Sequence, residues 1–252
     1  MMKLGRDPKN GRSILYQPHS SKFGGYSPND GTLDFYGRVG LLANTSHRFL
    51  DIGAGRAQWF EDDVIEQRRQ TRFMKGRYLE VIGADIDPIV STNRTVDYSV
   101  LIENGIVPLP DHSIHVVVAD YVLEHVVDPV GFSREIDRLL VPGGWFCART
   151  PHRLHYVAIA DWALPSGLAK RVLHRSQPDR KEEDVFPKVY RLNSLNDVSR
   201  AFPKWINKSF CYRTEPAYFF GSKKVFAIAD FFHRLAPVSL VGNLFIFLQK
   251  PH

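Results

Sequence analysis

Cysteine is scarce in this chain, and long apolar runs are missing from it. The 252 residues include two cysteines, Cys147 and Cys211, which excludes a disulfide framework and favours a reducing, cytoplasmic location. No apolar run approaches the roughly 18 residues that a membrane-spanning helix needs. The first ten residues are polar and charged, so we expect no signal peptide. The composition, 44% hydrophobic and 24% charged, is typical of a globular protein with a substantial core.

The excess of positive charge is mild. Lys and Arg number 33 against 27 Asp and Glu, a net charge of +6 with histidine neutral. This balance leaves RNA or an anionic membrane surface open as a partner without pointing to either. We interpret the basic clusters at 68–77 and 171–181 as solvated faces, which is how most charge runs behave.

Short apolar runs alternate with helix-like segments along the chain. Strand-like runs lie at 49–51, 79–85, 115–119 and 145–149, and helical patterns lie at 33–43, 58–72, 88–95 and 129–140. Strands that alternate with helices predict right-handed crossovers and a parallel sheet. Beyond residue 150 we expect a helical insertion followed by these elements: a helix at 195–202, a strand at 206–212, a helix at 225–235 and a last strand at 243–249.

The most informative stretch is Asp51-Ile52-Gly53-Ala54-Gly55. It follows the apolar pair Phe49-Leu50 and precedes a helix-like run. Two glycines separated by one residue let the backbone turn sharply and leave room for a ligand. A strand, a glycine turn and a helix N-terminus are typical of a site for a nucleoside cofactor.

Three further segments follow in order. Asp85 ends the next strand, where a carboxylate can accept hydrogen bonds from both hydroxyls of a ribose. Residues 107–113 lead into a strand that is followed by the segment 120–126, and Pro142-Gly143-Gly144 forms a tight turn before the fifth strand. NAD is disfavoured because the third glycine position of its binding motif is Gln58.

Together these segments resemble a class I S-adenosylmethionine-dependent methyltransferase of the small-molecule type. Residues 45 to 151 carry the resemblance, above all in the motifs Leu-Pro-Asp-x-Ser, Leu-Glu-His-Val and Leu-x-Pro-Gly-Gly. It implies an α/β fold: a Rossmann-like, seven-stranded, mostly parallel sheet with an antiparallel last strand, helices on both faces and a helical cap insertion. It also implies one domain over 1–252, divided into an N-terminal arm at 1–32, a cofactor-binding half at 33–150, a cap at 151–200 and C-terminal strands and helix at 201–252.

The resemblance implies S-adenosylmethionine as the cofactor and assigns residues to it. At the methionine end it places Asp51, which would order the amino group, and Gly53, Ala54, Gly55, Ala119 and Asp120. At the nucleoside end it places Asp85 on the ribose hydroxyls, Ile86 against the adenine, and Glu103 or Asn104 at the adenine edge. The chain departs from the family pattern at His115, which replaces the aspartate that usually starts that strand.

The acceptor side is less constrained. Because the sulfonium methyl is already activated, the protein mainly aligns the acceptor and excludes water. An oxygen acceptor also needs a base, and His125 is the candidate, with Tyr121 as a wall of the pocket. His152, His155 and Tyr156 follow the fifth strand and are candidates for the acceptor pocket. We expect no metal, because neither a cysteine nor a clear carboxylate completes a ligand set with the two histidines.

We therefore expect methyl transfer to an oxygen or nitrogen atom of a small molecule or a glycan precursor. The alternatives are an RNA methyltransferase and a protein that binds S-adenosylmethionine without transferring its methyl group. Nucleic acid is disfavoured because an Asn-Pro-Pro-Tyr-type motif is missing. The mixed apolar and basic stretch at 155–173 leaves a peripheral membrane contact open.

Overall fold

A computed structural model describes residues 23–163, 187–216, 219 and 222–252. Most of the predicted N-terminal arm, the middle of the predicted cap and the basic cluster at 171–181 lie outside these residues. Among the helices that are described, none combines the length and apolar character needed to cross a bilayer.

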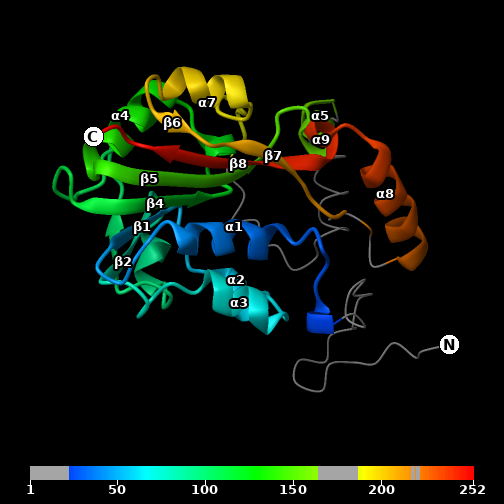
Figure 1. Ribbon diagram of the computed structural model, residues 1–252, viewed down its shortest axis with the longest axis horizontal. Helices are drawn as coiled ribbons and strands as arrows, with labels where there is room; N and C mark the ends of the chain where they lie inside the picture. Colours follow the sequence, from blue (N-terminus) through cyan, green and yellow to red (C-terminus); the bar gives the residue numbers. More distant parts are fainter. Residues whose placement is uncertain (1–22, 164–186, 217–218, 220–221) are drawn as a thin grey trace.

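One mixed sheet organises the chain (Figure 1). Its strands are β1 (Arg48–Ile52), β2 (Glu80–Asp85), β3 (Tyr98–Leu101), β4 (Ile114–Asp120), β5 (Leu140–Pro151), β6 (Ile206–Asn207), β7 (Phe210–Arg213) and β8 (Gly242–Gln249). The order is β3-β2-β1-β4-β5-β8-β6, and β7 also pairs with β8. The first five strands are mutually parallel, whereas β8 runs antiparallel to β5.

Eight strands fill seven positions of this sheet, because β6 and β7 follow one another along the same edge of β8. The single strand predicted at 206–212 is therefore interrupted. At the interruption Lys208 N–H donates to the Phe247 carbonyl, and Ser209 Oγ accepts from Phe247 N–H at 3.1 Å. These bonds replace the regular ladder, so the edge stays attached to β8.

Helices cover both faces of the sheet, as predicted. The longer ones are α1 (Gly31–Leu41), α4 (Pro129–Leu139), α5 (Tyr156–Ala163) and α8 (Lys223–Leu235), and the shorter ones are α2 (Gln58–Asp62), α3 (Glu66–Arg72), α7 (Leu195–Ala201) and α9 (Val238–Val241). Three one-turn 3-10 helices lie at Phe23–Gly25, Pro88–Thr92 and Leu123–His125. Figure 1 shows α7 and α1 on opposite sides of β5 and β8.

Alternation along the strands divides the core into two layers. Side chains such as Leu50, Val117 and Phe146 pack with α4 and α7, whereas their neighbours, such as Phe49 and Val118, pack with α1. Because both faces of β4 are covered, its run of valines is buried throughout, as a central parallel strand requires.

Two local predictions are wrong. The helix predicted at 58–72 is two helices, because the Asp63 carboxylate accepts a hydrogen bond from Ile65 N–H at 3.0 Å and forms a turn between them. The edge strand β3 is not among the predicted strands; it is short and its first residue, Tyr98, is 38% exposed, so it lacks a long apolar run.

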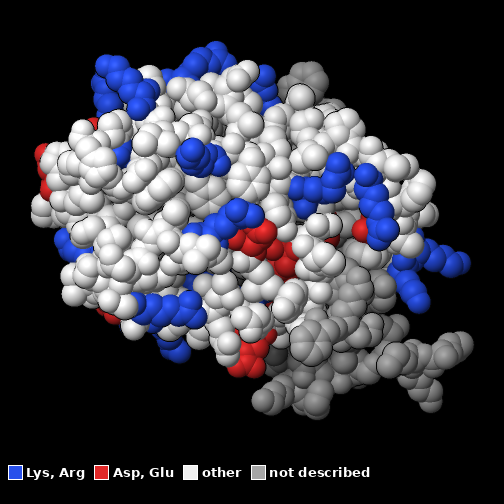
Figure 2. Space-filling view, in the orientation of Figure 1, with Lys and Arg blue, Asp and Glu red and all other residues white. Residues whose placement is uncertain are grey.

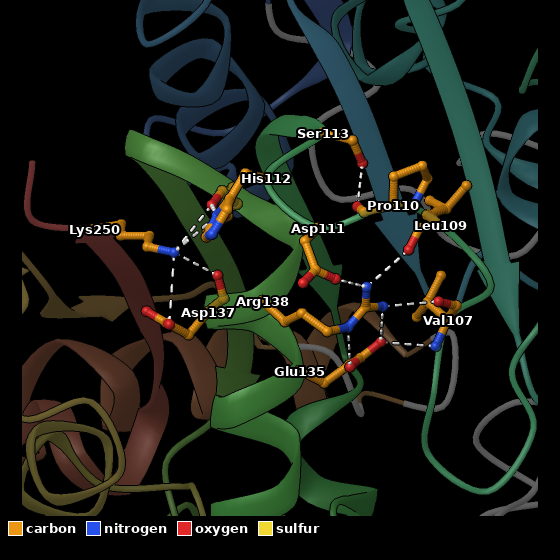
Figure 3. A network of polar contacts seen from close by, with 11 residues as sticks. Val107, Leu109, Pro110, Asp111, His112, Ser113, Glu135, Asp137, Arg138 and Lys250 are labelled. Carbon is orange, nitrogen blue, oxygen red and sulfur yellow. Dashed lines mark hydrogen bonds and ion pairs between the residues drawn. The ribbon is translucent and has the colours of Figure 1, made fainter.

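The Leu-Pro-Asp-x-Ser motif has a structural role at the amino end of β4 (Figure 3). Arg138 on α4 donates to the carbonyls of Val107 and Leu109 at 2.9 and 2.8 Å and pairs with Asp111 and Glu135. The Glu135 carboxylate, 7% exposed as a side chain, also accepts from Val107 N–H. One guanidinium thus ties the loop before β4 to the helix after it.

We predict that Arg138→Ala destabilises the fold. The change removes two carbonyl contacts and leaves the buried Glu135 carboxylate without its cation, which typically costs about 1–3 kcal/mol. Urea unfolding measures the free energy of unfolding. Arg134→Ala is the matched control, since Arg134 is exposed on the same helix, and we expect it to change the free energy by less than about 0.5 kcal/mol. Equal effects of the two changes would contradict the role of Arg138.

Candidate functional site

A large cavity lies at the carboxyl ends of the parallel strands. Its volume is about 1310 Å³, above the range of roughly 300–1,000 Å³ for ordinary small-molecule pockets. Its lining comes from the segment before α1, the turns after β1, β2 and β4, the hairpin at 102–107, helix α4, the ends of the cap, and described residues between 214 and 226. The cavity therefore has room for two molecules side by side.

The glycine turn after β1 lines this cavity. Gly53 has a φ of 72°, and a Cβ there would collide with the side chain of Val122. Its N–H donates to the Ala84 carbonyl at 2.7 Å, which turns the chain out of the sheet. Asn93 holds the other side of the turn, because its amide donates to the carbonyls of Ala54 and Gly55, both at 3.1 Å. No motif in the sequence points to Asn93.

Asp85 stands opposite this turn. One carboxylate oxygen accepts from Gly55 N–H at 2.8 Å and the other from Asp87 N–H at 3.0 Å. These two bonds fix the carboxylate plane at the cavity wall, next to Ile86, which is 61% exposed. Asn104 lines the same region from the turn of a hairpin in which Glu103 pairs with Ile106 through the backbone.

Tyr121 follows β4 in a strained conformation. Its φ is 60°, in the left-handed region that a large side chain rarely adopts. The ring lines the cavity, lies 5.0 Å from the Arg149 guanidinium, and its hydroxyl accepts from the Asn243 amide at 2.7 Å. Backbone strain of this kind persists where the surroundings impose it, commonly at functional sites.

His125 is oriented by the cap. Its Nδ1 lies 2.8 Å from the Pro187 carbonyl. Because a carbonyl only accepts, Nδ1 carries the proton, and Nε2 is the nitrogen with the lone pair in the neutral ring. The ring lines the cavity.

Glu124, which is not among the site residues predicted from the sequence, lines the cavity, as does His125. Its carboxylate accepts from the Thr150 hydroxyl at 2.8 Å, and its carbonyl accepts from Val189 and Tyr190 N–H. Burial raises the pKa of Glu124. The Leu-Glu-His-Val motif thus joins β4, β5 and the returning cap segment.

Two of the three residues predicted for the acceptor pocket after β5 reach the cavity. His155 and Tyr156 line it, with ring centroids 4.5 Å apart. Burial, with the neighbouring His233 and His152, lowers the pKa of His155 to about 4, so this ring is neutral at neutral pH. His152 does not line the cavity; its Nδ1 accepts from Leu154 N–H at 3.0 Å.

A buried charge cluster lies at the wall of the cavity, which its member Arg149 lines. Asp120 pairs with Arg149 through both carboxylate oxygens, at 2.7 and 2.8 Å, and also receives Arg72 at 3.3 Å and the Tyr36 hydroxyl at 3.1 Å. Burial opposes ionisation of Asp120, but the two arginines outweigh it and hold its pKa below the ordinary value. The Asp120 side chain is therefore engaged within the protein rather than at the cavity surface.

Asp51 lies in the same region, but its pKa is shifted in the opposite direction to that of Asp120. Burial, with the nearby carboxylates of Asp120 and Asp85, raises its pKa to about 7 in spite of Arg72. Among the described residues, the structure gives the Asp51 carboxylate no hydrogen-bond or ion-pair partner. Arg72 therefore offsets only part of the cost of a charge on Asp51.

The cavity brings together most of the residues singled out from the sequence. The predicted residues that line it are Gly53, Gly55, Asp85, Ile86, Asn104, Tyr121, His125, His155 and Tyr156. The predicted residues outside its lining are Asp51, Ala54, Glu103, Ala119, Asp120 and His152. Within the part of the chain that the structure describes, no group of three or more His, Cys, Asp or Glu is arranged to hold a metal ion.

Comparison with known proteins agrees with this architecture. A family model described as a methyltransferase domain matches residues 66–148. This stretch is therefore similar to a methyltransferase domain. A probable S-adenosylmethionine-dependent methyltransferase of Mycolicibacterium smegmatis is 40% identical over 88 residues, which are 33% of this chain and 34% of that protein. The match to this methyltransferase thus spans about a third of the relative's length.

Solved structures share the fold over most of the chain. Geranyl diphosphate C-methyltransferase from Streptomyces coelicolor, in complex with Mg²⁺, geranyl-S-thiolodiphosphate and S-adenosyl-L-homocysteine, has a TM-score of 0.53 and 14% identity and covers 87% of this chain and 73% of its own. The [4+2]-cyclase SpnF has a TM-score of 0.54 and 15% identity, and covers 95% of this chain and 87% of its own. The comparisons confirm the resemblance to class I methyltransferases, the α/β fold and S-adenosylmethionine as the cofactor.

We predict that Asp51 makes stability depend on pH. A carboxyl with a folded pKa of about 7 and an ordinary value of 3.8 stabilises the fold when protonated, and this contribution is lost as the pH rises through 7. Asp51→Asn should therefore stabilise the protein at alkaline pH by about 1–3 kcal/mol more than at mildly acidic pH. Urea unfolding of both proteins at the two pH values measures this difference. The same difference at both values would contradict the raised pKa.

Proposed function

We propose that the chain is an S-adenosylmethionine-dependent methyltransferase that acts on an oxygen or nitrogen atom of a small molecule or a glycan precursor. The observation that carries the proposal is the cavity wall formed by the glycine turn and Asp85. A backbone that admits no Cβ at Gly53 faces a carboxylate held in a fixed plane by two N–H groups. This arrangement lies at the carboxyl edge of the sheet, where ligands bind in folds of this kind.

The residues of this wall fit the cofactor. Asp85 would accept hydrogen bonds from the ribose hydroxyls, and the exposed side chain of Ile86 and the hairpin residue Asn104 would flank the adenine. The carboxylate of Asp51 suits the ammonium group of the methionine end, since a nearby cation favours its ionised form. When bound, the cofactor supplies a methyl group on a sulfonium, which is activated for in-line displacement.

The remaining assignments of the sequence analysis stay proposals for the same end of the ligand. We propose that Ala54 and Gly55 approach it through the backbone of the turn, and that Ala119 and Asp120 do so through the backbone at the end of β4. Glu103 would contribute through the hairpin that presents Asn104.

The acceptor half of the cavity contains the candidate base. With Nδ1 donating to the Pro187 carbonyl, the neutral His125 ring carries its lone pair on Nε2, the atom that would take a proton from an acceptor hydroxyl. Tyr121, His155 and Tyr156 would form walls around the acceptor. The arm before α1 and the cap border the same cavity, so we propose that residues 1–252 act as one methyltransferase unit.

One specific observation favours an alternative to methyl transfer. The solved relative SpnF has this fold at a TM-score of 0.54 and is a [4+2]-cyclase. The fold alone therefore does not decide between transfer and another reaction. The second candidate is a protein that binds the cofactor without transferring its methyl group.

Nucleic acid is the less favoured partner. Figure 2 shows Lys and Arg side chains spread over the visible face with acidic side chains among them. The prediction of a solvated basic face at 68–77 is wrong for two arginines: Arg68 and Arg72 are 23% and 21% exposed as side chains and pair with Asp30 and Asp120. Part of the basic excess thus balances internal carboxylates.

We predict that the protein binds S-adenosylmethionine and that Asp85→Asn weakens this binding about tenfold or more, because a ribose–carboxylate hydrogen bond is charge-assisted. Isothermal titration calorimetry measures the dissociation constant. Asp97→Asn is the matched control, since Asp97 also accepts a backbone N–H, from Val81 at the opposite end of β2. If wild type does not bind at high micromolar cofactor, the proposal fails; if both variants weaken binding equally, Asp85 has no special role.

We predict that His125→Gln abolishes most of the transfer while leaving cofactor affinity unchanged, since a positioned base typically contributes about 10²–10⁴-fold. The measurement is incorporation of labelled methyl from the cofactor into a metabolite extract, followed over pH. His47→Gln is the control; its ring stacks on His115 and lies outside the cavity lining. Cofactor binding without incorporation by wild type would favour the non-transferring candidate, and full activity of His125→Gln would exclude its role as base.

A further inference from the structure

Helix α8 presents an exposed apolar stripe. Its exposed large apolar residues are Val225 at 37%, Ile228 at 71%, Phe231 at 66%, Phe232 at 48% and Leu235 at 71%. These positions repeat at the spacing of one helix face. Single exposed apolar side chains are ordinary, but five on one face of one helix form a contact surface.

The opposite face of α8 attaches the helix to the body. His233 is 4% exposed, and its Nδ1 lies 2.9 Å from the Thr214 carbonyl. The Tyr156 ring contacts the His233 ring at 5.7 Å, and Phe226 lines the cavity. The helix is thus held by its buried face, and the exposed stripe takes no part in these contacts.

Positive charges outnumber negative charges along the helix that carries the stripe. Lys223 and Lys224 begin the helix, and Arg234 lies in its last turn. The one acid of the helix, Asp230, pairs with Arg234 at 2.7 Å. No carboxylate of the described residues forms an ion pair with either lysine. A helix with an apolar face and bordering lysines matches the chemistry of an anionic lipid surface.

We propose that α8 docks on an anionic membrane surface, with its apolar stripe among the lipid chains and its lysines at the headgroups. A second copy of the chain fits less well. Parallel pairing of two α8 helices would set the lysines against each other, and antiparallel pairing would set them near Arg234. An anionic lipid surface meets the same basic groups with opposite charge.

Docking in this way brings the cavity to the membrane. Figure 1 shows α8 at the edge of the molecule, beyond the end of the sheet where β5 ends and β8 begins. Phe226 reaches the cavity from the buried face of the same helix, and Ile159 on the adjacent α5 is 42% exposed. The sequence leaves a peripheral membrane contact open at 155–173, and the contact proposed here lies on α8 instead.

Sedimentation of the full chain with lipid vesicles tests the proposal. We expect binding to vesicles of phosphatidylcholine and phosphatidylglycerol, and much weaker binding to phosphatidylcholine alone. The triple variant Ile228→Ser, Phe231→Ser, Leu235→Ser should lower the partition coefficient about tenfold or more, because the buried apolar area drives insertion. The double variant Lys223→Glu, Lys224→Glu should weaken binding to the anionic vesicles and leave binding to phosphatidylcholine vesicles unchanged.

Leu41→Ser and Leu79→Ser are the matched controls, because these side chains are 86% and 66% exposed outside α8, and both variants should bind vesicles like wild type. Thermal unfolding checks that every variant is folded. Absence of wild-type binding, or equal binding of the triple variant, overturns the proposal. Light scattering that shows a wild-type dimer dissociated by the triple variant, without vesicle binding, assigns the stripe to self-association instead and also overturns it. Cofactor binding is not needed for any of these results.

Discussion

The buried pair of Asp120 and Arg149 supports the part of the structure on which the site depends. Asp120 ends β4 and Arg149 lies on the neighbouring β5, and both side chains are at most 5% exposed. Arg72 from α3, Tyr36 from α1 and the Thr32 hydroxyl complete the contacts of the two charges. Because an uncompensated charge in such a place is very costly, removing either partner would release four elements at once. The strained backbone of Tyr121 follows directly on this fixed point.

The pKa values of the two aspartates of this region are shifted in opposite directions. Asp120 is kept ionised by two arginines, whereas burial and neighbouring carboxylates raise the pKa of Asp51 to about 7. Ionisation of Asp51 does not stabilise the folded protein. A cationic ligand group beside it would offset that cost, so the free energy lost in folding becomes free energy available for binding.

Much of the fold follows from local patterns. The alternation of apolar runs and helices predicts the strands β1, β2, β4, β5 and β8 and the crossovers between them, because burial on both faces requires continuous apolar segments. The failures occur where a single polar contact overrides the pattern. Asp63 divides a helix that periodicity alone joins, and Ser209 interrupts an edge strand. Neither contact follows from the apolar periodicity, so that periodicity does not predict it.

The sequence by itself determines the glycine turn, the carboxylate at the end of β2 and the order of the motifs, since each depends on residues close together in the chain. Only the tertiary structure decides which of these meet. It brings Glu124 and Asn243 to the cavity from β-strand ends far apart in sequence, and it turns Asp120 away to Arg149. It also leaves one face of α8 exposed, although the apolar pattern of that helix equally suits burial. The apolar periodicity of a helix indicates which of its faces is apolar, whereas the packing of elements distant in sequence decides whether that face is covered.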